Sequence, residues 1–259
     1  SLRAFGAFRA GGLSPFIVAT GGTVYVDPTD ADYKIHEFTS SGTFTVTAAP
    51  TGATVAALLV AGGGSGDGGG GGAGGYVYRS SLSVSEGSYA VEIGAGGDPF
   101  GFPYYGGNSV FAGLYALGGG SQSSSTASGH GGSGAGGYEG LFYQYPYGGL
   151  GLQPTSASGG YGNNGASASV NGSGGGGGAG GAPSNNVGGA GRTADIINSS
   201  GAYETMAAGG WGTTSVATAL PAVGYGTGGW GGRKNDSNGN YLDPGYGGGG
   251  IVRIRYKFQ

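Results

Sequence analysis

Glycine occupies every third position of residues 62–76, a stretch that reads GGGSGDGGGGGAGGY. The five positions at this spacing are Gly63, Gly66, Gly69, Gly72 and Gly75. The same spacing returns in three later runs, residues 131–140, 172–181 and 226–232. A period of three is typical of a threefold extended helix, which has no internal hydrogen bonds, so its backbone groups must bond to neighbouring segments. We therefore predict a bundle of polyglycine-II helices, in which the first run is a rod roughly 40 Å long.

The overall composition favours a folded chain in spite of this glycine content. Glycine supplies 70 of the 259 residues, but the chain also carries 18 Tyr, 10 Phe and 2 Trp, with a net charge of -3. Disordered chains are usually poor in aromatic residues and rich in net charge. Glycine costs about 0.5–1 kcal/mol relative to alanine in regular structure, so a fold that keeps so many glycines must require them.

Seven segments are predicted to be β-strands. Residues 42–48, 88–93 and 251–258 alternate apolar and polar side chains, as half-buried strands do. Residues 54–61, TVAALLVA, lack alternation, so we expect this strand in the middle of a sheet with both faces covered. The other predicted strands are residues 76–85, 108–117 and 33–39.

The last strand has the clearest pattern, IVRIRYKF. Its apolar side chains are expected to face the core and its basic side chains to face water. The inward set is Val252, Ile254, Tyr256 and Phe258, and the outward set is Arg253, Arg255 and Lys257.

No segment combines a convincing helical period with capping residues. The best helical candidate, residues 193–208, is interrupted by Gly201. The predicted fold class is therefore all-β, an antiparallel β-sandwich with an inserted bundle of polyglycine-II helices and little or no α-helix. We divide the chain into an N-terminal attachment or strand segment, residues 1–37, and a glycine-rich domain of β-sandwich plus polyglycine II, residues 38–259.

Residues 38–97 and 247–258 carry motifs in a specific order: FTSSGTFTV, an apolar strand that enters a glycine run, the strand YVYRSS, then VEIGAGG, and finally GGGGIVRIRYKF. In this order they resemble the glycine-rich domain at the ends of bacteriophage tail fibres and related virion proteins. Residues 2–12, LRAFGAFRAGG, are similar to the segment that precedes such domains in phage tail proteins. The resemblance implies a polyglycine-II bundle attached to a β-sandwich, exposed on a virion and often trimeric, with receptor recognition by loops at the helix ends.

A more distant similarity is to the extracellular glycine-rich domain of the anaplastic lymphoma kinase receptor group. That similarity implies glycine helices inserted into a tumour-necrosis-factor-like sandwich, in a domain that carries disulfides. The chain has no cysteine, so the sequence favours the phage family.

Motifs that carry catalytic or metal chemistry are weak here. The pattern GxGxxG recurs, but a dinucleotide site needs it between a strand and a helix. The two histidines, His36 and His130, have no carboxylate pattern beside them, so we expect them to be structural or exposed. Asp67, within GGSGD, is expected on the outer, solvent-facing side of a rod. We therefore predict a non-enzymatic protein with no catalytic residues, no cofactor and no metal site.

The sequence argues against two classes of partner, nucleic acid and the lipid bilayer. Its ten Lys and Arg residues are scattered and form no basic patch of the kind that nucleic acid requires. Its longest apolar run, residues 54–61, is too short to span a bilayer. We expect neither nucleic-acid binding nor membrane insertion.

Aromatic loops punctuate the glycine runs and supply the candidate binding residues. Tyrosine and phenylalanine offer rigid contact area at a low entropy cost, which suits recognition of proteins and sugars. An alternative interpretation is that these rings cover the ends of the glycine helices, and both interpretations stay open for different rings. The receptor-binding candidates are Phe100, Phe102, Tyr104, Tyr105, Tyr143, Tyr145, Tyr147 and Tyr241.

The leading functional hypothesis is a bacteriophage tail-fibre or tail-tip protein on the exposed tail or fibre of the virion. It would bind a host receptor, protein or glycan, through aromatic loops on a rigid scaffold of glycine helices. The resemblance implies other virion tail proteins and a homotrimer as partners. The alternative hypothesis is a structural component of the tail or capsid with no direct host contact.

Overall fold

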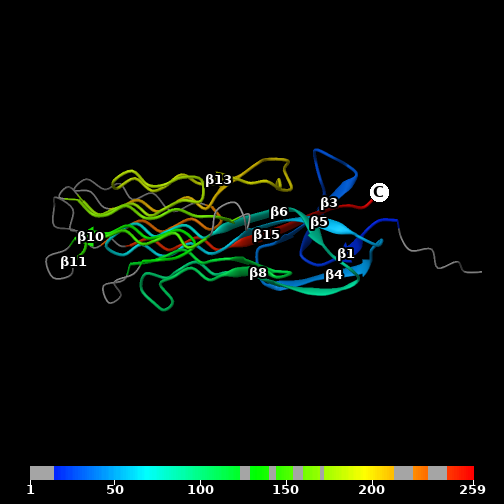
Figure 1. The fold of residues 1–259 in the computed structure, drawn as a ribbon, viewed down its shortest axis with the longest axis horizontal. Helices are drawn as coiled ribbons and strands as arrows, with labels where there is room; N and C mark the ends of the chain where they lie inside the picture. Colours follow the sequence, from blue (N-terminus) through cyan, green and yellow to red (C-terminus); the bar gives the residue numbers. More distant parts are fainter. Residues whose placement is uncertain are drawn as a thin grey trace, which may run out of the picture.

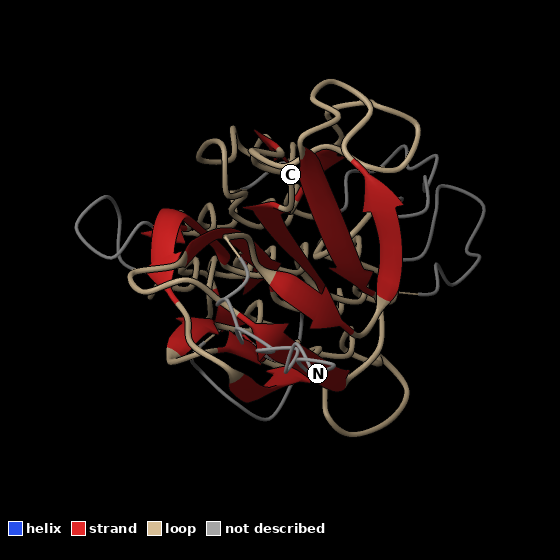
Figure 2. Cartoon of the chain, turned by 90° about the vertical axis from the view of Figure 1, so that its right-hand side faces the viewer, coloured by secondary structure: helices blue, strands red, loops and turns tan. Residues whose placement is uncertain are grey.

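The computed structural model describes residues 15–122, 129–139, 144–153, 160–169, 172–212, 224–232 and 244–259. Over these residues the chain is all-β, with antiparallel sheets and no helix, as predicted. The molecule is elongated: its two large sheets lie at one end, and glycine-rich segments run away from them along the long axis (Figure 1). Figure 2 looks onto the end that carries the sheets, with the strands in front of the glycine-rich segments.

The two large sheets contain eleven of the strands. The five-stranded sheet has the order β1, β4, β7, β8 and β9, with bounds Val18–Thr20, Gly42–Ala48, Gly87–Glu92, Ser109–Phe111 and Leu114–Ala116. The six-stranded sheet has the order β12, β6, β5, β15, β3 and β2, with bounds Gly160–Tyr161, Tyr76–Ser83, Thr54–Val60, Ile251–Lys257, Tyr33–Phe38 and Thr23–Val26. Two small ladders pair β10 (Tyr138–Glu139) with β11 (Gln144–Tyr145), and β13 (Arg192–Thr193) with β14 (Thr205–Met206).

A single apolar core joins the two sheets into a β-sandwich. Phe44 of β4 and Phe111 of β8 are fully buried, and their rings meet edge to face at 5.9 Å. From the opposite sheet, β5 and β15 contribute alternate residues to the same core. Those residues are Val55, Ala57 and Leu59 of β5, and Val252, Ile254 and Tyr256 of β15.

The outer face of the six-stranded sheet has a second core. Leu58 and Val60 of β5 pack there with residues 194–207, which cross over the sheet. The two faces of β5 are therefore both covered, as its uninterrupted apolar sequence predicted. The covering segment is the stretch that was the best helical candidate, and it forms β13, a turn with Gly201 at φ 81° and β14 instead of a helix.

Most predicted strands are confirmed within a residue or two. The exception is residues 108–117, which form two strands, because Ala112 and Gly113 turn the chain with φ values of 45° and 80°. Strands β1 and β2 were not predicted, and they lie at the edges of the two sheets. Their sequence, VATGGTVYV, has apolar residues but a glycine pair at its centre, which is where the chain passes from one sheet to the other.

The first glycine run is a hairpin and not one long rod. It connects the neighbouring strands β5 and β6, whose last pair is Val60 with Tyr76. The hairpin (residues 61–75) folds back at a bend over residues 67–69, so that the Ala61 amide donates to the Gly75 carbonyl at 3.0 Å and the Gly64 amide to the Gly72 carbonyl at 2.9 Å. The prediction of a single rod was wrong, because the period of three sets the local conformation but does not say where the chain reverses.

Hydrogen bonds along the returning leg of this hairpin recur with a period of three. The amides of residues 70–75 donate in turn to the segments 172–181, 226–232 and 117–122, and then to the same three segments again. The six acceptors are, in order, the carbonyls of Gly174, Gly229, Gly120, Gly177, Gly226 and Leu117, at distances between 2.7 and 3.0 Å. A threefold helix presents one amide to each of three neighbours per turn, so the polyglycine-II interpretation, which stays a prediction, accounts for this order.

Neighbouring segments approach the hairpin from all sides. Every residue from 61 to 77 is buried. A Cβ added at Gly72 would lie 2.1 Å from the Ser133 carbonyl oxygen, and one at Gly71 would lie 2.2 Å from that of Gly64. Glycine is thus required between the triplet positions as well as at them, and the sequence motif understates the steric constraint.

We predict that Gly72→Ala lowers the free energy of unfolding by about 1–3 kcal/mol or more, because a methyl group would collide with a backbone carbonyl. The matched control is Gly249→Ala, where an added Cβ meets no atom within 4 Å and the change should stay within about 0.5 kcal/mol. Denaturant unfolding of the two variants tests this, and equal effects would contradict the packing described for the hairpin.

Candidate functional site

The first group of predicted site residues lies at the end of a second glycine hairpin. This hairpin (residues 93–108) connects β7 and β8, and its legs are joined by the Gly107 amide, which donates to the Ala95 carbonyl at 2.8 Å. Near its end the Asp98 amide donates to the Pro103 carbonyl at 3.1 Å, and the Asp98 carboxylate accepts the Phe100 amide at 2.8 Å. These bonds fix the backbone of residues 98–105, which we call the aromatic tip.

The rings of the aromatic tip differ in exposure. Phe102 is 85% exposed and Phe100 is 62% exposed. Tyr104 and Tyr105 are half-buried. The Phe102 and Tyr104 ring centroids are 4.7 Å apart. The two phenylalanines therefore project from the molecule, whereas the two tyrosines pack against it. The recognition and covering interpretations of these rings stay predictions.

A buried polar chain connects the aromatic tip to Tyr147. The Tyr104 carbonyl accepts hydrogen bonds from the amide and the hydroxyl of Ser65, at 2.9 and 3.0 Å. The Ser65 hydroxyl also lies 3.1 Å from that of Ser121. The next residue, Gln122, donates from Nε2 to the Tyr147 carbonyl at 3.2 Å. Tyr147, 79% exposed, therefore lies beside the segment that carries Ser121 and Gln122.

One exposed ring near the aromatic tip was not among the predicted residues. Tyr246 is 58% exposed, and its ring centroid lies 6.0 Å from that of Phe100. Tyr246 stands beside a glycine run, in the sequence PGYGGGG, as the other candidates do. The same sequence pattern could therefore have identified Tyr246 as a candidate. Of the remaining candidates, Tyr145 lies in β11, and its ring is outside the described part of the structure, as are Tyr143 and Tyr241 altogether.

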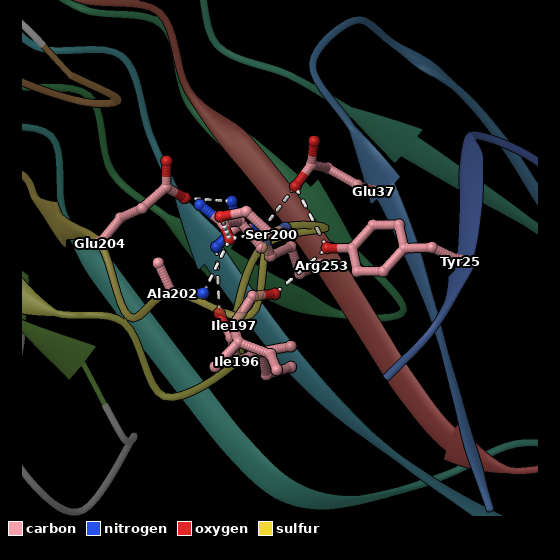
Figure 3. Close-up of polar contacts among 9 residues, drawn as sticks. Tyr25, Glu37, Ile196, Ile197, Ser200, Ala202, Glu204 and Arg253 are labelled. Carbon is pink, nitrogen blue, oxygen red and sulfur yellow. Dashed lines mark hydrogen bonds and ion pairs between the residues drawn. The ribbon is translucent and has the colours of Figure 1, made fainter. Parts of the chain in front are cut away.

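The second polar feature is a charged cluster on the outer face of the six-stranded sheet, centred on Arg253 of β15 (Figure 3). Its side chain is 1% exposed. The guanidinium donates from Nε to the Glu37 carboxylate at 2.7 Å, from Nη1 to the Ile196 carbonyl at 3.0 Å, and from Nη2 to the Glu204 carboxylate. The prediction that Arg253 faces water was wrong, because residues 194–207 cover the face onto which alternation directed it.

The partners of Arg253 come from the sheet and from the covering segment. Glu37 is its direct cross-strand neighbour on β3, whereas Ile196 and Glu204 belong to the covering segment. Tyr25 of β2 completes the cluster by donating to the Glu37 carboxylate at 3.3 Å and to the Ile197 carbonyl at 3.1 Å. Arg253 therefore ties the covering segment to the sheet, with both carboxylates compensating its charge.

The electrostatics of the cluster follow from burial and pairing. Burial opposes the charge of Arg253, but its bonds to Glu204 and Glu37 outweigh burial and raise the pKa of the guanidinium. Burial and the neighbouring Glu37 raise the pKa of the Tyr25 hydroxyl. Both groups therefore keep their ordinary protonation near neutral pH, and the cluster acts as a fixed structural clamp.

The other two basic residues of β15 are more exposed than Arg253. Arg255 lies against the buried Asp27 carboxylate, with Nε 2.6 Å from Oδ2, and its guanidinium stacks over the Tyr33 ring at 3.7 Å. Lys257 and Asp32 form an ion pair at 3.2 Å in which each side chain is about half exposed. The outward prediction is therefore right for Lys257 and only partly right for Arg255.

Arg253→Met should lower the free energy of unfolding by about 3–5 kcal/mol, since it leaves two carboxylates without their cation. Lys257→Met, on the same strand, removes an exposed ion pair and should cost about 0–1 kcal/mol. Chemical denaturation followed by circular dichroism measures both changes. Similar losses in the two variants would mean that Arg253 does not hold the covering segment.

The two histidines differ in environment. His36 is fully buried, with Nδ1 2.7 Å from the Gly21 carbonyl oxygen and Nε2 3.0 Å from the Tyr256 hydroxyl. Since a carbonyl only accepts, Nδ1 carries the proton and Nε2 accepts from Tyr256. Burial lowers the pKa of His36. His130 is exposed, and its Nδ1 accepts the Leu150 amide at 2.8 Å, so both residues are structural or exposed as predicted.

The lowered pKa of His36 predicts a pH-dependent stability. The unfolded chain takes up a proton near the ordinary pKa of 6.5, whereas the buried His36 of the folded chain resists protonation. The contribution of His36 to the free energy of unfolding should therefore be fully present above that pH and should decrease as the pH falls below it. Unfolding titrations between about pH 5 and pH 7.5 should show this slope. His36→Gln should abolish the slope and His130→Gln should keep it; an unchanged slope in the first variant would refute the assignment.

Asp67 was expected on the outside of a rod, and that prediction was wrong. Its side chain is buried, at 4% exposure, in the bend of the first glycine hairpin. The Asp67 carbonyl accepts the Gly232 amide at 2.6 Å, so another glycine segment covers the bend. A linear rod would have an outer face at this position, but a reversal inside a bundle does not.

Comparison with known proteins identifies one relationship. A family model described as a glycine-rich domain matches residues 39–257. No curated protein matches the chain. Among the described residues there is no group of three or more His, Cys, Asp or Glu side chains placed to hold a metal ion. Nor does that part of the chain contain a helix long and apolar enough to cross a membrane.

Proposed function

The chain belongs to the family of glycine-rich domains, and we propose that it is a bacteriophage tail-fibre or tail-tip protein that binds a host receptor without catalysing a reaction. The phage assignment is supported by the ordered motifs of residues 38–97 and 247–258. The binding role is supported by one observation above the others, the projection of Phe100 and Phe102 from a hydrogen-bonded tip.

A rigid tip suits this role because binding then costs little conformational entropy. The backbone of the aromatic tip is fixed by its own bonds and by Ser65 of the first glycine hairpin. Exposed phenylalanine side chains are unfavourable in water, and contiguous exposed apolar groups commonly mark interaction sites. Tyr246, which is exposed and whose ring lies 6.0 Å from that of Phe100, extends the exposed aromatic surface of the tip.

The proposal places the protein on the exposed tail or fibre of a virion, with other tail proteins and two further copies of itself as partners. The alternative, a structural component of the tail or capsid, would use the same aromatic rings as contacts with other virion proteins. Cryo-electron microscopy of a particle that contains the chain separates the two. An aromatic tip at the distal surface supports receptor binding, and a tip buried against virion proteins supports the structural role.

The double variant Phe100→Ala, Phe102→Ala should reduce binding of the purified, labelled protein to host cells by at least about tenfold, because large aromatic anchors dominate the energy of interfaces. The control is Tyr203→Ala, which removes a ring that is 60% exposed but lies on the segment covering the sheet. Flow cytometry of cells from a panel of bacterial strains provides the measurement.

The thermal stability of both variants should match that of the unaltered protein, because the three rings are solvent-exposed. Equal cell binding by the double variant and the control would argue against the aromatic tip as the receptor site. Binding to no strain by the unaltered protein would favour the structural alternative.

A further inference from the structure

A pocket of about 320 Å³ lies at the side of the β-sandwich, where β6 of one sheet meets the β8–β9 hairpin of the other. It is lined by Val77, Arg79, Gly113, Leu114, Tyr115, Leu117 and Gln153. Known ligand pockets begin at about 300 Å³, so this volume admits a small molecule. None of the lining residues belongs to the aromatic tip.

Arg79 supplies the charge of this pocket. On β6 it pairs with Ala57, and Val77 pairs with Leu59, both of which belong to the core between the sheets. Arg79 is thus a cation on the inner face of its sheet, at the margin of the apolar core, and its side chain is half-buried. Among the described residues it forms no ion pair, and its described hydrogen bond is a long one, 3.4 Å from Nη1 to the Tyr78 carbonyl.

This situation differs from that of the other arginines on the sheet. Arg253 and Arg255 each have a carboxylate oxygen within 2.7 Å of Nε. A guanidinium at an apolar wall gains most from a planar anion, because its parallel N–H groups match the two oxygens of a carboxylate. Arg79 lines the pocket and has N–H groups that could bind such an anion there.

Gln153 provides a fixed polar group on the opposite side of the pocket. It is 5% exposed, and its amide bonds to the edge of β9: Oε1 accepts the Leu117 amide at 2.8 Å and Nε2 donates to the Tyr115 carbonyl at 3.3 Å. A Cβ at Gly75 would lie 2.3 Å from Oε1, so the glycine hairpin holds the side chain in place. A primary amide has two hydrogens, and the second remains to donate to a ligand.

We propose that this pocket binds small organic carboxylates with an apolar body. The carboxylate lies on Arg79 and receives the second hydrogen of the Gln153 amide. The apolar body packs against Val77, Leu114 and Leu117. Gly113, where an added Cβ would meet no atom within 4 Å, leaves the mouth of the pocket open beside the β8–β9 turn.

Sodium hexanoate is the probe that tests this proposal, titrated into the full chain labelled with nitrogen-15. The side-chain amide of Gln153 and the backbone amide of Gly113 should shift in the NMR spectrum, with a dissociation constant on the order of 1 mM. Hexylammonium, which reverses the charge on the same apolar body, should give no such shifts. Arg79→Gln should weaken hexanoate binding at least about tenfold, since it removes a charge-assisted bond.

Lys34→Gln is the matched control, because Lys34 also has no ion pair among the described residues but lies over the Phe258 ring, away from the pocket lining. That variant should bind hexanoate as the unaltered protein does. The proposal is overturned if hexanoate leaves Gln153 and Gly113 unshifted at tens of millimolar. It is also overturned if hexanoate and hexylammonium bind the unaltered protein equally, a comparison that needs no variant to fold.

Discussion

The buried backbone amides of the glycine segments need carbonyl acceptors, most of which lie on other segments, and the architecture outside the sandwich follows from this requirement. Residues 61–77 are all buried, and a buried N–H without an acceptor costs as much as a lost hydrogen bond. In a β-sheet each strand bonds to two neighbours in one plane. Here, the amides of residues 70–75 donate hydrogen bonds to three neighbouring segments in a repeating order, so the hydrogen bonding extends in three dimensions.

Glycine is the residue that makes such close packing possible. At positions such as Gly66 and Gly72, an added Cβ would lie 1.7 and 2.1 Å from a carbonyl oxygen of a neighbouring segment. The segments therefore approach within hydrogen-bonding distance on several sides at once, which no other residue allows. Stability in this half of the molecule comes from main-chain bonds, whereas in the sandwich it comes from apolar burial across two cores.

The glycine hairpins are continuations of strand pairs, and in this way the β-sandwich is connected to the aromatic tip. The β5–β6 pair leads into residues 61–75, and the β7–β8 pair leads into residues 93–108. The two hairpins are joined by hydrogen bonds; for example, the Ser65 amide and hydroxyl both donate to the Tyr104 carbonyl. The register of the strands and the backbone hydrogen bonds between the hairpins therefore fix the position of the aromatic tip. At the opposite side of the sheet, Arg253 fixes the covering segment through buried charge.

The sequence by itself determined the all-β class, most strands of the sandwich and the recurrence of glycine, because side-chain alternation and the spacing of three are local properties. It also identified the rings of the aromatic tip, since clustered Phe and Tyr beside proline are visible without a fold. Only the tertiary structure decided where the chain reverses, so the first run is a hairpin and Asp67 is buried in its bend. It also decided that Arg253 lies inside, because alternation assigns a side chain only to one face of a sheet. The segment that covers that face is more than forty residues away in the chain, and its Glu204 precedes Arg253 by 49 residues.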